Sequence, residues 1–412
     1  MKRVVVTGMS AITPLGNDAE TSWTNLLAGK SGVRRIESFD PSEFDAQIAA
    51  EVRDFDPCKH IDKKAAKRME IFTQYGVSCA KMLFESMGWT IPAEEASRVG
   101  VNFGVGLGGL HGIEEQHKKL LEKGPSRISP FFIPTIIANM GAGQVSIEAG
   151  AKGPNICITT ACSSSTHAIG YAYTDIVMGR ADAMICGGAE STITPLGIAG
   201  FTALKALCTD NSDPEKASRP FDANRSGFIM GEGCGMLFIE SLEHAQARGA
   251  NILAEIVGFG ASGDAYHMTA PPESGEGMAL AMAAAVREAG IKPEQIDYIN
   301  AHGTSTKLND MCETRAVKTV FGDHAYKLCM SSNKSQIGHL LGAAGGVEAM
   351  FTVRSLVEGK LPGTTNYETP DPECDLDYIT EGSRDLQVEY AMSNSFGFGG
   401  TNGSLIFKRF QG

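Results

Sequence analysis

The sequence predicts an α/β fold in which two similar halves form one structural unit, and three observations lead to this prediction. Segments typical of strands and of helices alternate along all 412 residues, without a low-complexity linker. The order of strand, turn and helix occurs twice, which places a seam near residue 250 and gives halves of 1–250 and 251–412. Glycine accounts for 48 of the 412 residues, about 12% against a usual share of about 7%, which indicates many tight turns. We expect a mainly parallel sheet in each half.

The first half contains four runs of strand length. The first run is rich in β-branched valine and stops at Gly8, and the last is ended by Gly187 and Gly188. The runs cover residues 4–7, 99–103, 156–158 and 184–186. Apolar residues at helical spacing predict a helix over 72–89, and a start rich in hydroxyl groups predicts another over 163–178. Gly179 is a typical residue to end that second helix.

The second half follows the same order. Strands are expected at 255–258, 298–300, 328–330, 390–393 and 404–407, the last two on either side of a glycine turn at 397–400. Helices are expected over 276–289 and over 339–358, where Gly359 follows. The common order of the two halves suggests a duplicated α/β unit.

Composition and charge exclude several classes of protein. Lys and Arg minus Asp and Glu give 36 − 48 = −12, which argues against nucleic-acid binding because that function needs a basic surface. Ten cysteines without a C-x-x-C pair favour reduced thiols in a cytoplasmic protein over a disulfide scaffold or structural zinc. No run approaches the ~18 apolar residues of a membrane span, and the N-terminal run is too short for a signal peptide. We expect a soluble, cytoplasmic chain that binds neither nucleic acid nor membrane.

Cys162 is the first candidate for chemistry. It follows a predicted strand and begins a helix in the segment TTACSSST, so unpaired N–H groups and the positive end of the helix dipole favour a thiolate. The same N–H groups can bind an oxyanion. The alternative is a small buried apolar residue, which is the usual role of cysteine in a core.

Two histidines occupy comparable places. His302 stands at a predicted strand end in NAHGTST, where α/β enzymes place catalytic groups. His339 stands at a predicted helix start in NKSQIGH, where the dipole disfavours the imidazolium. The alternatives are a loop histidine and a helix-capping histidine. The glycine run after Asn394 could bring a backbone N–H close to a substrate, or could be a plain tight turn.

Two other patterns are weaker. Residues 104–109 match G-x-G-x-x-G after a strand, but no acidic residue stands on a following strand about 20 residues on, so a dinucleotide site is not expected. His111 and His117 flank two glutamates, yet a spacing of six does not put two ligands on one helix face, and we interpret this stretch as a solvated helix.

Several motifs, in order, resemble those of the condensing enzymes. They are TPLG near Pro14, TACSSS, SRPFDANRSGF at 218–228, NAHGTST, KSQIGHLLGAAGG and NSFGFGGTNGSL. The chain is similar, from residue 3 to about 408, to the β-ketoacyl-acyl-carrier-protein synthases of the type II subclass. This resemblance implies the thiolase fold, a five-layer αβαβα sandwich made of the two halves, and a homodimer.

The resemblance also implies a reaction and its residues. Cys162 would take an acyl chain as a thioester, and a malonyl group on the carrier protein would lose CO2 and attack it, which elongates a fatty acid by two carbons. His302 and His339 would donate hydrogen bonds to the enolate oxygen, with Lys334 as support near His339 and Glu348. The N–H groups of Cys162 and Phe398 would form a second oxyanion hole, and Phe398 would gate the acyl pocket.

Binding residues are implied in the same way. Thr304 and Thr306 would bind the 4′-phosphopantetheine arm, which arrives on the carrier protein, and no other cofactor is expected. The acyl tunnel would be lined by Leu107 and Phe201, with Phe132 of the partner subunit. A basic patch for the acidic carrier protein would contain Lys64, Lys67, Arg68, Arg127 and Lys205. A structural Na⁺ or K⁺ is held in some relatives at positions that correspond to Asn300, Glu348, Ser393 and Asn394.

Some departures and alternatives remain. Lys307 stands where a proline often follows HGTST, and Asn333 where a threonine is common before the lysine; both bear on substrate preference. Cys162 excludes the chain-length-factor relatives, which lack the nucleophile. A polyketide or secondary-lipid ketosynthase would share this mechanism. A thiolase would need a second catalytic cysteine near the C-terminal glycine loop, but the last cysteine is Cys374. A non-catalytic interaction protein is the remaining alternative.

Overall fold

The computed structural model describes residues 2–411, and its central feature is a ten-stranded mixed sheet. The strand order is β10-β9-β13-β14-β8-β1-β7-β6-β4-β5. The strands of the first half are β1 (Val4–Ile12), β4 (Val99–Gly104), β5 (Asn155–Ile158), β6 (Ala183–Glu190) and β7 (Gly233–Ser241). Those of the second half are β8 (Ala254–Gly263), β9 (Tyr298–Asn300), β10 (Cys329–Ser331), β13 (Tyr390–Gly397) and β14 (Thr401–Arg409).

The two halves of the sheet match each other strand by strand. Outward from the centre, β1-β7-β6-β4-β5 corresponds to β8-β14-β13-β9-β10. In each set the outer three strands pair in parallel and the inner pairings are antiparallel. The sets meet where β1 and β8 pair through three residues each. The expectation of a mainly parallel sheet in each half is therefore wrong: two of the four pairings in each half are antiparallel. Strands β13 and β14, for example, are joined by a tight turn that needs no crossover.

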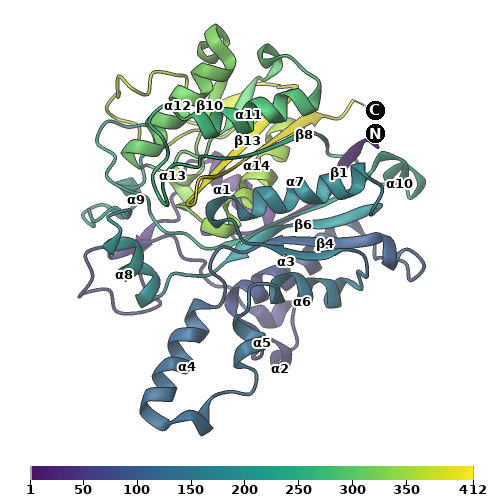
Figure 1. Cartoon of the computed structure of the whole chain (residues 1–412), viewed down its shortest axis with the longest axis vertical. Helices are drawn as coiled ribbons and strands as arrows, with labels where there is room; N and C mark the ends of the chain where they lie inside the picture. Colours follow the sequence, from purple (N-terminus) through teal and green to yellow (C-terminus); the bar gives the residue numbers. More distant parts are fainter. Residues whose placement is uncertain (1, 412) are drawn as a thin grey trace.

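Five layers are visible from top to bottom in Figure 1. Helices α11 (Glu276–Ala289) and α12 (Lys307–Phe321) cover the second-half strands, and α3 (Ile71–Met87) and α6 (Met140–Ala149) cover those of the first half. Helices α7 (Ser164–Val177) and α14 (Ala344–Glu358) lie between the two sets of strands and contact both. Both central helices are buried along most of their length. The α/β class and the αβαβα order expected from the resemblance are confirmed.

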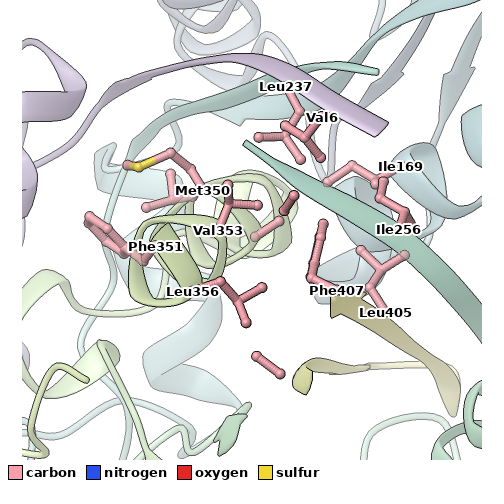
Figure 2. Packing of buried hydrophobic residues seen from close by; sticks show 14 of the residues in the cluster. Val6, Ile169, Leu237, Ile256, Met350, Phe351, Val353, Leu356, Leu405 and Phe407 are labelled. Carbon is pink, nitrogen blue, oxygen red and sulfur yellow. The ribbon is translucent and has the colours of Figure 1, made fainter. Parts of the chain in front are cut away.

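One hydrophobic core joins the two halves. Figure 2 shows Val6 and Leu237 from the first set of strands, Ile256 and Phe407 from the second, and Val353 of α14 packed together. These side chains are at most 1% exposed. Truncating one large buried apolar side chain typically costs about 2–5 kcal/mol of stability. Separating the halves would expose several such side chains at once, so neither half is expected to be stable alone.

Several shorter elements complete the chain. The helices are α1 (Ala19–Leu27), α2 (Lys63–Ala66), α4 (Leu110–Lys123), α5 (Phe132–Ile136), α8 (Pro195–Ala203), α9 (Pro214–Ala217), α10 (Leu242–Ala247) and α13 (Lys334–Ile337). The short strands are β2 (Arg34–Arg35), β3 (Ile48–Ala49), β11 (Lys360–Leu361) and β12 (Arg384–Asp385). Helices α4 and α5 extend away from the layers in Figure 1. Within residues 2–411, no helix combines the length and apolar character that crossing a membrane requires.

Three expectations about the elements are wrong in detail. The first strand does not stop at Gly8, because β1 continues through it to Ile12. Gly187 and Gly188 do not end a strand, because β6 continues through them to Glu190. A Cβ on Gly187 would lie 2.0 Å from the carbonyl oxygen of Gly235, so glycine permits the close approach of β7 here. The helix predicted from residue 339 begins only at Ala344, and His339 lies before it in a segment that bridges Met230.

Candidate active site

Cys162 lies in a short 3-10 turn between β5 and α7. The turn covers Ala161–Ser163 and leads directly into α7 at Ser164. Ala161 has a φ of +50°, a left-handed conformation that costs a residue with a Cβ roughly 1–2 kcal/mol. The strand end and helix start predicted around the cysteine are therefore present, and Cys162 as a whole residue is 7% exposed.

Opposing effects act on the Cys162 thiol. Burial raises its pKa to about 11, while Lys334, the backbone N–H of Phe398 and the N–H of Cys162 itself lower it. Burial thus outweighs the stabilisation of a thiolate that was expected from the helix N-terminus. The two N–H groups nevertheless lie against the sulfur, which is where an oxyanion hole for a thioester on this sulfur requires them.

His302 and His339 converge on Cys162. One nitrogen of each ring and the Cys162 sulfur all lie within 4.8 Å of one another. The two imidazole centroids are 5.2 Å apart with the rings nearly perpendicular. His302 lies two residues after the end of β9, and His339 forms backbone hydrogen bonds with Ile229 and Gly231, on either side of Met230. The structure thus brings together the three residues singled out from separate motifs.

The hydrogen bonds of the two rings define which nitrogen carries the proton. The N–H of Leu341 donates to Nδ1 of His339 at 3.3 Å, which leaves Nε2 as the protonated atom, and this atom is buried without a partner. The Lys334 ammonium lies 3.4 Å from Nδ1 of His302, so Nε2 is the protonated nitrogen there also. Each ring can therefore offer one Nε2–H to a substrate oxygen.

Both histidines are held in the neutral form. Burial, followed by the charge of Lys334, lowers the pKa of His302 and of His339 well below the usual value for histidine. The neutrality of His339 was expected from a helix N-terminus, but α14 begins five residues later. Burial and the ammonium group replace the dipole as the cause.

Lys334 forms a buried ion pair with Glu348. The lysine is on α13, the glutamate on α14, and both are 1% exposed. The predicted proximity of Lys334 to Glu348 is present. The ammonium group contacts Nδ1 of His302, and its charge also lowers the pKa of His339. The pair supplies a fixed positive charge beside two neutral imidazoles.

Glu313 on α12 was not singled out from the sequence. Its carboxylate accepts hydrogen bonds from the N–H groups of His302, at 2.9 Å, and Gly303, at 2.8 Å. Burial raises its pKa to about 7. A single acid within an ordinary helix pattern carries no sequence signal of this role, because its partners are ten and eleven residues away, outside its own helix.

A cavity of about 290 Å³ opens onto these groups. Its wall includes Cys162, both histidines, Thr304, Thr306, Phe398 and Lys205. The hydroxyl groups of Thr304 and Thr306 are 2.9 Å apart, so they form one polar edge of the cavity. Asp264 and Asn402 also line it, joined by a 2.7 Å hydrogen bond, and neither was singled out from the sequence.

The three residues predicted for the acyl tunnel are placed differently. Phe201 contacts Phe398 and Phe228, with centroid distances of 6.4 and 5.5 Å, and so lies next to the cavity wall. Leu107 is half exposed, Phe132 is partly buried, and neither lines the cavity. A tunnel that reaches them extends beyond the space that one copy of the chain encloses.

The five basic residues predicted for docking are all exposed. Lys64 is on α2, Lys67 and Arg68 follow it, and the Arg68 guanidinium lies 4.5 Å over the ring of Phe131. Lys205 alone among the five lines the cavity, and Arg127 lies after α4.

Three of the four residues predicted for a cation offer free oxygens that fit an oxygen-ligated ion. Ser393 pairs directly with Asn300 across β13 and β9, and the Asn300 amide donates to the backbone oxygen of Glu348 at 3.1 Å. Oδ1 of Asn300, Oε2 of Glu348 and Oγ of Ser393 are buried oxygens without a hydrogen-bond partner. The side-chain oxygen of Asn394 instead accepts from Ser404. Such oxygens are the ligands that hard cations prefer.

The two weaker patterns have ordinary explanations. His111 and His117 are exposed on α4, which agrees with a solvated helix. In residues 2–411, Cys162, His302 and His339 form the single cluster of histidine, cysteine or acidic groups close enough to hold a metal. The N–H groups of the turn at 106–108 bind the carboxylate of Glu190.

Comparison with known proteins agrees with this geometry. Residues 1–245 match the family model of the β-ketoacyl synthase N-terminal domain, and residues 253–368 match that of the C-terminal domain. The chain is 52% identical to proteins called 3-oxoacyl-[acyl-carrier-protein] synthase 2 from Coxiella burnetii and Vibrio cholerae, over 99% of both chains in each case.

Solved structures give the same result. A β-ketoacyl synthase from Burkholderia phymatum superposes with a TM-score of 0.92 at 37% identity, over all of both chains. A type II PKS ketosynthase in complex with its acyl-carrier protein gives 0.92 at 32% identity, also over all of both chains. The fold is that of these thiolase-type ketosynthases, and the chain belongs to the β-ketoacyl synthase family of condensing acyltransferases.

Proposed function

We propose that the chain elongates fatty acids by two carbons, through decarboxylative condensation of malonyl-carrier protein with an acyl chain bound to Cys162. One observation carries the proposal: a buried thiol and one ring nitrogen of each of two histidines converge within 4.8 Å of one another in the wall of a cavity. The names of the relatives at 52% identity point to the same reaction.

In the first step the Cys162 sulfur attacks the thioester carbon of an acyl-carrier protein. A new carbon–sulfur bond forms, the pantetheine sulfur leaves, and it takes up the proton that Cys162 loses. The tetrahedral intermediate carries a negative oxygen, which the N–H groups of Cys162 and Phe398 stabilise. Since the resting thiol has a raised pKa, its deprotonation accompanies the attack rather than precedes it.

In the second step the malonyl thioester oxygen accepts hydrogen bonds from Nε2–H of His302 and His339. The bond between the malonyl C2 carbon and the carboxylate breaks, and CO2 leaves. The electron pair of that bond forms the enolate, whose charge the two donors stabilise. The carbanion carbon then attacks the carbonyl carbon of the Cys162 thioester, the carbon–sulfur bond breaks, and the departing thiolate takes a proton from solvent. Neutral imidazoles suit this role because they donate a hydrogen bond without giving up a proton, whereas an imidazolium could protonate the malonyl carboxylate that has to leave as CO2.

Lys334, Glu348 and Glu313 act through the histidines. Lys334 fixes the tautomer of His302, and its charge adds to burial in keeping both rings neutral. Glu348 balances the lysine charge, and Glu313 holds the backbone on which His302 stands. We assign no proton transfer to Lys334.

The same proposal includes a structural Na⁺ or K⁺ beside the site. Asn300, Glu348 and Ser393 would hold it through their three unpartnered oxygens, with Asn394 next to them. Bound there, the ion would supply positive charge that fixes the ends of β9 and β13, and it would take no part in bond making.

Acyl-carrier protein is the proposed partner. Thr304 and Thr306 would bind its pantetheine arm in the cavity, and Lys64, Lys67, Arg68, Arg127 and Lys205 would attract its acidic surface. One of the similar solved structures is a ketosynthase in complex with its acyl-carrier protein, which supports this pairing.

A homodimer in the cytoplasm is also proposed. Strand β5 is the edge of the sheet, and its residues Asn155 and Ile156 are exposed. An unprotected edge with an exposed isoleucine is typical of a strand that pairs with another chain. A second copy seated there would bring Phe132 of the partner subunit toward an acyl tunnel that continues past Leu107.

A polyketide or secondary-lipid role is the second candidate. Ketosynthases of that kind are similar in structure, but at 32–34% identity against 52% for the 3-oxoacyl synthases. A thiolase is disfavoured because no cysteine besides Cys162 lines the cavity.

The deciding experiment offers the protein malonyl-carrier protein and saturated acyl-carrier proteins of varied length, with mass spectrometry of the products. A 3-oxoacyl product two carbons longer than its donor is expected. Absence of condensation with every fatty acyl donor, together with condensation of polyketide starter units, would favour the second candidate.

A further inference from the structure

Glu190, the last residue of β6, is a fully buried carboxylate that no step above uses. Within residues 2–411 no lysine, arginine or histidine forms an ion pair with it; its partners are backbone N–H groups. Gly106 donates at 2.8 Å, Leu107 at 3.2 Å, Gly108 at 3.3 Å and Gly342 at 3.2 Å. Four donors on one buried carboxylate form an anion-binding nest that is filled from within the chain.

Glu190 accounts for Gly106, the middle glycine of the G-x-G-x-x-G pattern, and for Gly342. A Cβ added to Gly106 would lie 2.3 Å from Oε2 of Glu190, and one added to Gly342 would lie 2.7 Å from it. A side chain at either position would therefore displace the carboxylate. The N–H groups that a dinucleotide phosphate would need are already bound to Glu190.

Glu190 connects two parts of the proposed site. On one side it holds the N–H of Leu107, the residue expected beside the acyl chain. On the other it holds Gly342, the neighbour of Leu341, whose own N–H fixes the tautomer of His339. Leu341 also packs in the same apolar cluster as Cys162.

We infer that Glu190 is a positioning residue: its carboxylate locks the turn at 106–108 to the turn at 341–343, and so places Leu107 for long acyl chains and His339 for decarboxylation. This inference rests on the proposed function. Burial raises the pKa of Glu190 to about 7 against the effect of its four donors. Assays at pH 8 therefore test it mainly as the ionised carboxylate.

The test is Glu190→Gln, which keeps the size of the side chain but turns one acceptor oxygen into a donor that faces N–H groups. We expect the ratio of kcat/KM for long over short acyl donors to fall about tenfold, because an N–H of the Leu107 turn loses its acceptor. The kcat for malonyl decarboxylation should fall as well. Glu190→Asp, which keeps the charge, should restore part of both.

The matched control is Asp222→Asn. Asp222 is also fully buried and accepts three backbone N–H bonds, from Asn224, Glu368 and Thr369. This change disturbs a buried carboxylate that accepts backbone N–H bonds in a part of the chain away from Leu107 and His339. It should therefore leave the ratio of kcat/KM for long over short acyl donors unaltered. Thermal unfolding of each variant reports its effect on the fold.

Gly106→Ala gives an independent version of the test, and it decides the matter if Glu190→Gln does not fold. Its Cβ should displace the carboxylate and lower the same ratio, and its effect combined with Glu190→Gln should be less than additive. The inference is overturned if the unmodified enzyme condenses but Glu190→Gln and Gly106→Ala both leave the chain-length ratio unchanged. It is also overturned if they lower that ratio no more than Asp222→Asn does. If the unmodified chain itself fails to condense, the proposed function falls, and this inference with it.

Discussion

Ala161 and Leu341 occupy equivalent points of the two halves, and both have a positive φ, +50° and +48° respectively. Each begins a 3-10 turn that leads into a central helix, α7 after Ala161 and α14 after Leu341. A left-handed residue with a Cβ at both points indicates that the fold requires this turn twice. In the first half the next residue is Cys162, and in the second it is Gly342, which Glu190 binds.

Cys162 should be the one cysteine of the ten that becomes acylated, because it alone among them lines the cavity. Incubation with an acyl-carrier protein, followed by peptide mapping, should find one acyl group on Cys162. Cys162→Ala should abolish condensation and leave the unfolding temperature nearly unchanged. Label on Cys157 or Cys186 would show that the nucleophile has been misassigned.

His302→Ala and His339→Ala should each slow malonyl decarboxylation by about 10²–10³, the usual effect of losing one donor to an oxyanion. The measurement is CO2 release from malonyl-carrier protein. His324→Ala is the matched control, since His324 binds a backbone oxygen at 2.8 Å and does not line the cavity. A variant of His302 or His339 that decarboxylates at the control's rate would remove that residue from the mechanism.

The pH dependence of decarboxylation should lack the midpoint near 6.5 that an ordinary histidine gives. Burial lowers the pKa of both His302 and His339, so both remain neutral as the pH falls through 6.5 and lose their role only in more acidic solution. The decarboxylation rate should therefore stay flat between about pH 6.5 and 8 as far as these groups are concerned. Lys334→Met removes the positive charge that, after burial, lowers the pKa of both histidines. The loss of activity in acid should therefore begin at a higher pH in this variant.

Leu107→Phe should impair long acyl donors more than short ones, because added volume in a tunnel wall cannot be accommodated without strain. Acylation rates of Cys162 with donors of increasing length measure this. Leu121→Phe is a control, since Leu121 is exposed on α4. Equal losses at every length would place Leu107 outside the tunnel.

Reversal of Lys64, Lys67 and Arg68 to Glu should slow acyl transfer from the carrier protein and weaken its dependence on salt, because steering by the basic patch is lost. Transfer from a small acyl thioester should hardly change. The matched control reverses Lys292, Lys327 and Lys360, three exposed lysines of the second half, which gives the same change in net charge. Equal slowing with both donors would mean that the patch supports the fold.

The sequence determined most elements and the proposed reactive residues, because their signals are local. The helix at 276–289 and the strand at 298–300 have the predicted bounds, since apolar spacing and β-branched residues act within a few neighbours. Cys162, His302, Lys334 and His339 stand in turns whose glycines and hydroxyl residues are visible in the sequence. The strand at 184–186 was ended too early, because Gly187 and Gly188 allow close packing of strands rather than a turn. The helix at 339 was started too early, because an extended segment precedes it.

The tertiary structure alone decided how these residues act on one another. Glu313 and Glu190 are single acids in ordinary patterns, and their roles depend on N–H groups that lie 10 to 152 residues away in the chain. The raised pKa of Cys162 and the lowered pKa values of the two histidines follow from burial between the halves and from the charge of Lys334. Burial and through-space charge are properties of the packed molecule, so no local pattern could have specified them.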